Sequence, residues 1–509
     1  ELLAELSPGL LQMLELTGLG TKKVRLLYNS QGIDSIEKLE ANLASGKVQE
    51  LPGMGEKSAA KITKSIENYR ILKKTSDRFG VAKARKIALE AQKYLLTSAL
   101  LDKVQIVGSL RRWQETIGNI DIIATTKKST EPLKVINFFH DYQSIKKILT
   151  SSETKTTVLL TSEIKVTLRI LAKDSFGSAL LYYTGSKGHN LWLSRRAKQG
   201  GLRLEKSGLF DGKTNERINA NTEEEIFTTL GLEFTPPELR QVSPESGEAL
   251  YSREIKKGIK PLRLIETSDI LGDLHMHSTY SDGSARIIEM AEAARLRGYS
   301  YVAITDHSRA VGIAHGLSEK RLLIQIQEID ELNKRYKEEG IDFRILKGTE
   351  VDILASGALD FPPSVLENLD CVIGAVHSGL DMPIEVMTNR VVSAIETGLI
   401  NILAHPTGRI INRRLPYAID IGAVMSAAKK HRVALELNSY PDRLDLKDTF
   451  CRQAKEAGVL VAVSTDSHSV LGLGNMAYGI GTARRGGLGK EDIINTLTLE
   501  KLLGFLNRD

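Results

Sequence analysis

The stretch DLHMHSTYSDG, residues 273–283, decides the fold of the C-terminal half of the chain. It places two histidines two residues apart directly after a short apolar run, and side chains two apart on a strand point to the same face. Short apolar runs then alternate with helical segments such as IIEMAEAARLRG, as far as VLVAVSTDSH at residues 459–468. Repeated β-then-α units at this spacing predict a parallel barrel with its functional side chains at the C-terminal ends of the strands.

The histidines follow this expectation. Six of the ten stand at or just after the ends of predicted strands, and three carboxylates stand beside them in the sequence. These nine residues are His275, His277, Asp282, His307, Glu350, His377, His405, Asp466 and His468. Imidazole nitrogens and carboxylate oxygens suit zinc, manganese or iron, and nine of them exceed what one ion can use. One histidine at a strand end is usually an ordinary core or surface group, but six with three carboxylates predict two or three metal ions that share ligands.

These segments resemble the PHP (polymerase and histidinol phosphatase) domain over roughly residues 270–508. The resemblance implies a distorted (β/α)7 barrel that holds two to three ions, Mn²⁺ or Zn²⁺, for phosphoester hydrolysis. It implies that one ion is bound by His275, His277, Glu350 and Asp466, a second by Glu350, His377 and His405, and a third by Asp282, His307 and His468. The expected catalytic residues are His275, His277, Glu350, Asp466 and Arg409.

Arg409 lies in HPTGRIINRR, directly after one of the metal-ligand segments. A guanidinium there is expected to receive a substrate phosphate by a bidentate contact. A charge on a solvated loop is the alternative interpretation.

Two glycine-rich turns punctuate the helical spacing of the first hundred residues, GLGTKK at 18–23 and GMGEKS at 53–58. Glycine allows a tight turn and lets a phosphate approach the backbone N–H groups at a helix start. The pair resembles helix-hairpin-helix motifs, which bind DNA backbones without reading sequence. The implied DNA contacts are Gly18, Gly20, Lys22, Gly53, Gly55 and Lys57, and ordinary helix-connecting turns are the alternative.

A mixed α/β region follows. Its segments GSLRRWQETIGNIDIIATT at 108–126 and YYTGSKGHN at 182–190 resemble the bacterial family X (β-like) DNA polymerases, in which a C-terminal PHP domain is the usual partner. The resemblance implies a nucleotidyltransferase palm. In it Ser109 and Arg112 would contact a nucleoside triphosphate, Tyr182, Tyr183 and Gly185 would face its sugar, and Asn190 would touch the base edge.

The palm departs from the family at its catalytic carboxylates. Family members use three, two in a D-x-D strand and one on the neighbouring strand, to hold two magnesium ions. Here the three positions read Asn119, Asp121 and Thr167. Hard divalent ions prefer anionic oxygen, so residual Mg²⁺ binding is weakened and polymerisation is expected to be lost or slow.

Charge and length fit a multidomain α/β protein. The 509 residues carry a net charge of +6, but residues 51–200 hold 27 Lys and Arg against 12 Asp and Glu, a net +15 suited to a polyanion. We expect a helix-hairpin-helix region at 1–100, a palm and thumb-like region at 101–234, a linker at 235–265 and the PHP domain at 266–509. Two cysteines and no apolar run long enough for a bilayer favour a cytoplasmic protein that does not contact membranes.

These observations together favour a monomeric DNA repair protein whose PHP domain removes nucleotides from the 3′ ends of gapped or 3′-ended duplexes, independently of sequence. Two alternatives stay open. The chain could be an active gap-filling DNA polymerase of base excision repair, or a small-molecule phosphatase of the histidinol-phosphatase type. The basic segment and the paired hairpins speak against the second alternative, because a small substrate needs neither.

Overall fold

The computed structural model describes residues 8–16, 18–73, 78–127, 130–243, 246–252 and 263–507. The chain forms two compact units, residues 1–78 with 412–415, and residues 79–411 with 416–509. Much of the expected linker, residues 244–245 and 253–262, lies outside the described residues. No helix in the described ranges combines the length and the apolar character needed to cross a membrane.

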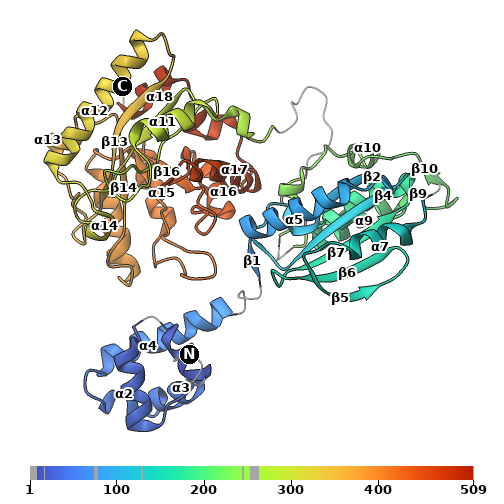
Figure 1. The fold of residues 1–509 in the computed structure, drawn as a ribbon, viewed down its shortest axis with the longest axis horizontal. Coiled ribbons are helices and arrows are strands. Elements are labelled where there is room, and N and C mark those ends of the chain that lie inside the picture. The colour runs from blue at the N-terminus through green and yellow to red at the C-terminus, as the bar shows by residue number, and fades with distance from the viewer. Residues whose placement is uncertain are drawn as a thin grey trace. The chain divides into compact units, whose positions relative to one another are not determined.

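The first unit is helical, drawn in dark blue in Figure 1. Its elements are α1 (Pro8–Leu14), α2 (Thr21–Gln31), α3 (Ile36–Ala44), the 3₁₀ turn η1 (Lys47–Glu50) and α4 (Glu56–Lys73). Leu19 and Met54, the apolar residues between the glycines of the two turns, are buried in its core with Leu27 and Ile62. Each glycine-rich turn is therefore anchored by its middle residue and leaves its glycines at the surface.

The helical unit ends before the expected boundary at residue 100. Helix α5 (Val81–Leu96) buries Ala84, Ala88 and Ala91 in the core of the next sheet rather than in the helical unit. Small residues at this spacing form one continuous stripe along a helix, so α5 can approach the strands closely.

A five-stranded sheet forms the middle of the chain, in the order β2-β4-β7-β6-β5. Its strands are β2 (Leu101–Val107), β4 (Asn119–Thr126), β5 (Ile145–Ser151), β6 (Lys155–Leu160) and β7 (Lys165–Leu171). Strands β4 and β7 are parallel neighbours, and their register places Asp121 opposite Thr167. The two strands that carry the expected catalytic positions therefore lie side by side, as the resemblance implies.

Helices and two small sheets surround these strands (Figure 1). The helices are α6 (Gly108–Arg111), α7 (Pro132–His140), α8 (Phe176–Thr184), α9 (Lys187–Gln199) and α10 (Glu223–Thr229), with 3₁₀ turns η2 (Lys173–Ser175) and η3 (Pro237–Leu239). The short strands are β1 (Phe79–Gly80) with β3 (Thr116–Ile117), and β8 (Leu202–Glu205), β9 (Gly208–Asp211) and β10 (Arg217–Ile218).

The C-terminal part is a seven-stranded parallel sheet in sequential order, β11 to β17. Its strands are β11 (Gly272–Asp273), β12 (Tyr301–Ile304), β13 (Arg344–Asp352), β14 (Cys371–Ala375), β15 (Ile402–Leu403), β16 (Ala434–Asn438) and β17 (Val461–Ser464). A parallel bridge between Met276 and Ser467 joins the first strand to the last, so the sheet nearly closes into a barrel. The expected distorted (β/α)7 barrel is confirmed.

Helices alternate with these strands around the barrel. They are α11 (Ile287–Arg295), α12 (Glu319–Glu338), α13 (Pro363–Leu366), α14 (Ile384–Glu396), α15 (Ile421–Lys430), α16 (Asp448–Ala457), α17 (Met476–Arg485) and α18 (Leu499–Leu506). Short 3₁₀ turns lie at η4 (Thr267–Asp269), η5 (Gly312–Ala314), η6 (Gly472–Asn475), η7 (Lys490–Asp492) and η8 (Ile494–Thr496).

The amino-terminal end of the barrel is filled by apolar side chains. Tyr301, Cys371 and Ala434, the first residues of their strands, share a buried cluster with Leu502 and Leu506 of α18. The predicted metal ligands lie at the opposite end, where the strands finish.

Candidate functional site

The carboxyl ends of the barrel strands bring all nine predicted metal ligands together. Six of the seven strands contribute at least one ligand, on the strand itself or on the loop that follows it. Three overlapping groups of ligand atoms could each hold an ion: His277, Asp282, His307 and His468; His275, His277 and Asp466; and His307, Glu350 and His377. These groups differ from the expected division, because His277 and His307 each lie in two of them and His405 lies in none.

Glu350 occupies the middle of the cluster, with 1% of its side chain exposed. Its Oε1 lies 3.0 Å from Nε2 of His405 and 3.3 Å from Nε2 of His377. Its Oε2 lies 3.4 Å from Nε2 of His275 and 2.8 Å from Nδ1 of His307. A carboxylate with different histidines at its two oxygens has the arrangement of a bridging ligand between two ions.

The second focus is His277, whose Nε2 lies 3.1 Å from Oδ1 of Asp466 and 3.2 Å from Nε2 of His275. Its Nδ1 is buried and makes no hydrogen bond. Nδ1 of His307 and Oε2 of Glu350 are also buried without a hydrogen bond, although they are only 2.8 Å apart. Buried polar atoms normally have hydrogen-bond partners, so these donor atoms fit a metal centre, which is how such groups are satisfied.

The outer part of the cluster is open to solvent. Asp282 and His468 have 32% and 38% of their side chains exposed, and their Oδ1 and Nε2 atoms lie 3.3 Å apart. A substrate can therefore reach the cluster at this pair, whereas His275 and Glu350 are sealed inside the protein.

The charges of the cluster are strongly coupled. Burial raises the pKa of Glu350, but the surrounding His307, His275 and His377 outweigh it and hold that pKa well below its usual range. Burial lowers the pKa of His275, yet Glu436, Glu350 and Asp466 outweigh it and raise that pKa well above its ordinary value. Glu350 therefore stays ionised and needs compensating cations, either imidazolium groups or the divalent ions that replace their protons.

Sequence reasoning missed two carboxylates that contact the Nδ1 atoms of predicted histidine ligands. Oε1 of Glu436 lies 2.7 Å from Nδ1 of His275, and Oδ1 of Asp352 lies 2.9 Å from Nδ1 of His377. The available signal was an ionisable residue inside an apolar strand, as in VALELN at 433–438 and GTEVDIL at 348–354. Such residues are rarely buried unless a partner binds them.

Arg409 does not join the cluster. Its Nη2 donates to the carboxylate of Glu115 at 2.8 Å and to the carbonyl of Leu444 at 2.5 Å, and the residue is buried. Its Nη2 is thus engaged within the protein, and its Nε is buried without a hydrogen bond. The predicted contact with a substrate phosphate stays a prediction. The arginine beside the cluster is Arg443, whose Nε lies 3.8 Å from Oδ2 of Asp466.

At the predicted polymerase site, Asp121 is the single remaining carboxylate of the three positions. Arg169 donates to its Oδ1 at 2.7 Å, and Asn119 donates to its Oδ2 at 2.6 Å. Thr167, at the third position, has its hydroxyl 3.1 Å from that of Thr157. Both oxygens of the one carboxylate are therefore occupied, and this donor set does not fit a pair of magnesium ions.

The predicted nucleotide-contacting residues lie together around α8. Arg112 donates to the carbonyl of Thr184, and a Cβ added to Gly185, at φ +69°, would lie 3.1 Å from Nη1 of Arg112. Asn190 donates to the carbonyl of Tyr182 at 2.7 Å. Ser109 lies in α6, three residues before Arg112.

Arginine side chains give this region a positive charge. The Arg169 guanidinium lies 4.7 Å from the centre of the Tyr183 ring. Burial, reinforced by nearby Arg485 and Arg240, lowers the pKa of Arg112 to about 10, so it remains charged at neutral pH. The phosphate-facing half of the predicted nucleotide site is thus preserved better than its metal-binding half.

The two hairpin turns have the backbone that the sequence predicts. Gly18 and Gly53 have positive φ values of 87° and 76°, which glycine adopts without strain. Gly20 and Gly55 directly precede α2 and α4, and both Lys22 and Lys57 are exposed. Nζ of Lys23 lies 3.4 Å from the Ser58 hydroxyl, so the two turns are neighbours.

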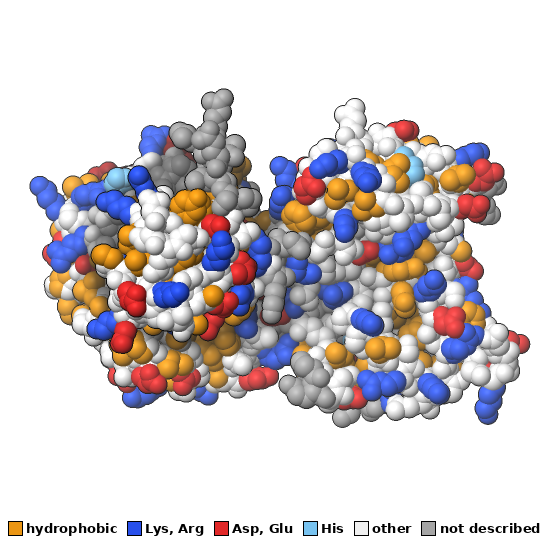
Figure 2. All heavy atoms as spheres, turned by 90° about the horizontal axis from the view of Figure 1, so that it is seen from below, with side chains coloured by type: hydrophobic (Ala, Val, Ile, Leu, Met, Phe, Trp, Pro, Cys, Tyr) orange, Lys and Arg blue, Asp and Glu red, His pale blue; other side chains and the backbone are white. Residues whose placement is uncertain are grey.

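The surface charge is mixed rather than gathered into one block. Figure 2 shows Lys and Arg side chains distributed among acidic and apolar ones over the visible face. A basic excess spread in this way suits general attraction to a polyanion, and phosphate contacts at the hairpin turns stay a prediction.

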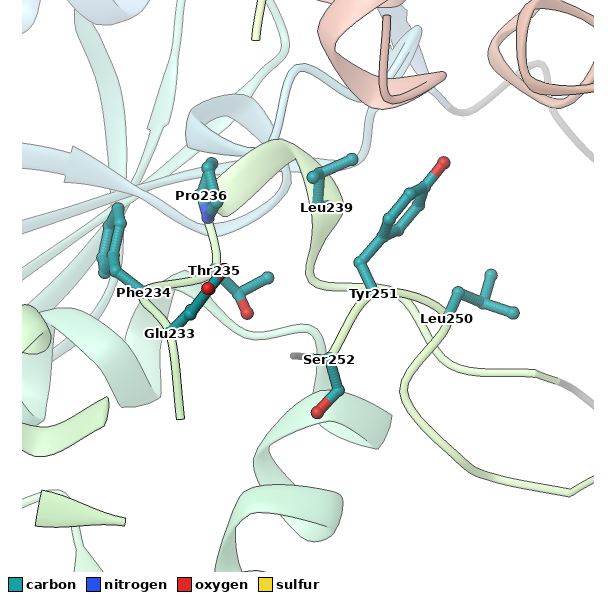
Figure 3. A pocket seen from close by; sticks show the side chains of 8 residues that line it. All are labelled: Glu233, Phe234, Thr235, Pro236, Leu239, Leu250, Tyr251 and Ser252. Carbon is teal, nitrogen blue, oxygen red and sulfur yellow. The ribbon is translucent and has the colours of Figure 1, made fainter. Parts of the chain in front are cut away.

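A cavity of about 250 Å³ lies away from all of these sites. Its lining, drawn in Figure 3, comes from two segments around η3, Glu233–Leu239 and Leu250–Ser252. None of the predicted site residues lines it.

Three protein families match the chain in an order that agrees with this architecture. A SAM-like helix-hairpin-helix tandem matches residues 10–68, the DNA polymerase beta thumb matches residues 179–241, and the PHP domain matches residues 273–440. The fold and sites therefore define a polymerase-type protein of family X joined to a metal-dependent PHP domain.

Proteins of similar sequence identify the family within this class. DNA polymerase/3′-5′ exonuclease PolX of Bacillus subtilis is 38% identical over 507 residues, which cover 99% of this chain and 86% of that protein. The chain belongs to the PolX family of bacterial family X polymerases. A probable phosphatase of Thermoanaerobacter sp. is 31% identical over 237 residues, covering 44% of this chain and 89% of that protein. The crystal structure of Leishmania infantum polymerase beta in a ternary P/T complex is 18% identical with a TM-score of 0.29, and covers 46% of this chain and 100% of that one.

Proposed function

We propose that this chain is a cytoplasmic DNA repair enzyme that acts mainly as a metal-dependent 3′–5′ exonuclease through its PHP domain, with a palm that polymerises weakly or not at all. One contrast carries the proposal. Nine predicted metal ligands meet at the barrel end, whereas the single palm carboxylate, Asp121, is engaged by Arg169 and Asn119.

Divalent ions bound by the nine ligands would supply the Lewis acidity that phosphoester hydrolysis requires. The histidine-rich donor set favours Mn²⁺ or Zn²⁺ over Mg²⁺. The protein's own part is to hold Glu350 between its four histidines, to keep His275 and His277 dry, and to leave the Asp282–His468 side open for the DNA end.

The helix-hairpin-helix unit would bring the DNA. Exposed Lys22 and Lys57 beside the two glycine turns suit sequence-independent phosphate contacts, which position a duplex without reading its bases. We propose that a monomer binds gapped or 3′-ended duplexes in this way.

A gap-filling polymerase is the second candidate, favoured by the similarity to PolX over 99% of the chain. The histidinol-phosphatase type is the third, favoured by the probable phosphatases that match the PHP part alone.

The purified protein with Mn²⁺ can be given a 5′-labelled gapped duplex, and in parallel a small phosphomonoester such as histidinol phosphate. The proposal expects stepwise shortening of the DNA strand and at least a hundredfold lower kcat/KM on the small ester. Faster hydrolysis of the small ester would contradict it and favour the phosphatase.

A further inference from the structure

Strand β16 differs from every other strand of the barrel. None of the nine predicted ligands lies on it or on the turn that follows it. Its last three residues nevertheless include Glu436 and Asn438, both fully buried at the end of the barrel where the predicted ligands meet. Side chains two apart on a strand share a face, so both point toward the ligand cluster.

Glu436 contacts ligands from two other strands. Its Oε1 lies 2.7 Å from Nδ1 of His275, which follows β11. Its Oε2 accepts the backbone N–H of His405, which follows β15, also at 2.7 Å. One carboxylate therefore fixes a ligand ring and a ligand backbone together.

Asn438 extends the same network to a third ligand. Its Nδ2 donates to Oδ2 of Asp466 at 3.0 Å and to Oε2 of Glu436 at 3.2 Å. Its Oδ1 accepts the backbone N–H of Tyr440, which fixes the orientation of the amide. With its Oδ2 held in this way, Asp466 presents Oδ1 to His277 at 3.1 Å.

The contact to Glu436 decides which nitrogen of His275 can bind a metal. A carboxylate accepts a hydrogen bond from Nδ1–H, so the proton of the neutral ring stays on Nδ1 and the lone pair lies on Nε2. That Nε2 faces the cluster, 3.2 Å from Nε2 of His277 and 3.4 Å from Oε2 of Glu350. The geometry therefore holds the ring in the tautomer that ligation needs.

We propose that Glu436, supported by Asn438, is a positioning residue of the PHP metal centre that sets the tautomer of His275 and the placement of His405 and Asp466. This proposal rests on the metal centre described above but not on the identity of its substrate. Strand β16 thus contributes to the centre by orienting ligands from β11, β15 and β17 rather than by binding an ion.

Glu436→Gln is the sharpest variant, because it keeps the shape of the side chain. Its amide NH₂ would donate to Nδ1 of His275 and so place the ring proton on Nε2, facing the cluster. We expect the metal-free variant to unfold within a few degrees of the wild type but to bind Mn²⁺ about 10- to 100-fold more weakly by calorimetry. Glu436→Asp should recover part of the affinity, since it restores the acceptor.

Asp360→Asn is the matched control. Asp360 is also a buried carboxylate of the barrel, but it accepts from the Ala310 backbone and Arg309, not from a ligand. Its removal should leave Mn²⁺ affinity within about twofold of the wild type.

The proposal is overturned if Glu436→Gln binds Mn²⁺ as tightly as the wild type, or no more weakly than Asp360→Asn. If Glu436→Gln does not fold, Asn438→Ala provides the test, with an expected severalfold loss of Mn²⁺ affinity, and unchanged affinity overturns the proposal. Calorimetry uses the full chain and the metal alone, so a wrong assignment of the exonuclease would leave this result intact.

Discussion

The guanidinium of Arg169 lies 2.7 Å from Oδ1 of Asp121, the one carboxylate at the three catalytic positions of the palm. Both side chains are about one-fifth exposed, so this ion pair is partly shielded from water. A cation of the chain thus occupies the oxygen that a metal ion would need, and Asn119 occupies the other. The palm keeps its strands and its arginines, whereas only one carboxylate stands at its three predicted catalytic positions.

Aspartates at the two palm positions that lack a carboxylate should raise the polymerase activity. In Asn119→Asp with Thr167→Asp, three carboxylates would face one another across β4 and β7, because the register already pairs positions 121 and 167. We expect primer extension on a gapped duplex with Mn²⁺ to rise at least tenfold above the wild type. Each single variant is the control and should gain little. No gain in the double variant would mean that other palm residues also block the reaction.

Metal binding should stabilise the barrel. Ions that bind only the folded ligand cluster add about 2.7 kcal/mol at a concentration of about 100 times Kd. Mn²⁺ or Zn²⁺ should therefore raise the Tm of the wild type in a calorimetric scan, and a chelator should reverse the shift. The double variant His275→Ala with His277→Ala should show no such shift, and an equal shift in that variant would place the ions elsewhere.

Loss of Arg409 should affect stability before chemistry. Arg409→Ala leaves the buried Leu444 carbonyl without its donor and removes the contact to Glu115, at a cost of about 1–3 kcal/mol. Urea unfolding should report this loss, while KM for DNA changes less than twofold. A large rise in KM with unchanged stability would instead make Arg409 a substrate contact, as the sequence first suggested.

The hairpin lysines should determine part of the salt dependence of DNA binding. Each phosphate contact removed should reduce the slope of log K against log salt by about 1. Lys22→Ala and Lys57→Ala are expected to do so in fluorescence anisotropy with a gapped duplex. Lys38→Ala is the matched control, because Lys38 lies on α3, away from the two turns, and is paired with Asp34. Equal effects from all three lysines would indicate general charge attraction and no specific role for the turns.

The sequence predicted the barrel, and it indicated nine candidate ligands, because strand ends are local signals. A histidine or carboxylate directly after an apolar run can be read without knowing the fold, and parallel strands carry such residues to one end. The role of Glu436 was not predicted, because no local signal in the sequence indicates which residues it contacts. It lies inside a strand, and only the closure of the barrel places it 2.7 Å from His275, 161 residues away in the sequence.

Two other differences have the same physical origin. The sequence indicates only that Arg409 is a cation on a loop, because its contacts to Glu115 and Leu444 arise from tertiary packing. Helix α5 reads as a continuation of the preceding helices, and only the sheet that follows explains its alanine stripe. The ion pair of Asp121 with Arg169, whose strands are separated by β5 and β6 in the chain, also depends on the register of β4 and β7.

We propose that the chain shortens DNA at the PHP centre and does not extend it at the palm. The most direct measurement follows a 5′-labelled primer in a gapped duplex with Mn²⁺, with and without the four deoxynucleoside triphosphates. We compare the wild type with the double variant His275→Ala with His277→Ala. We expect the wild type to shorten the primer with and without the deoxynucleoside triphosphates, and the variant to leave it unshortened. Lengthening at ordinary polymerase rates, or shortening that survives in the double variant, would contradict it.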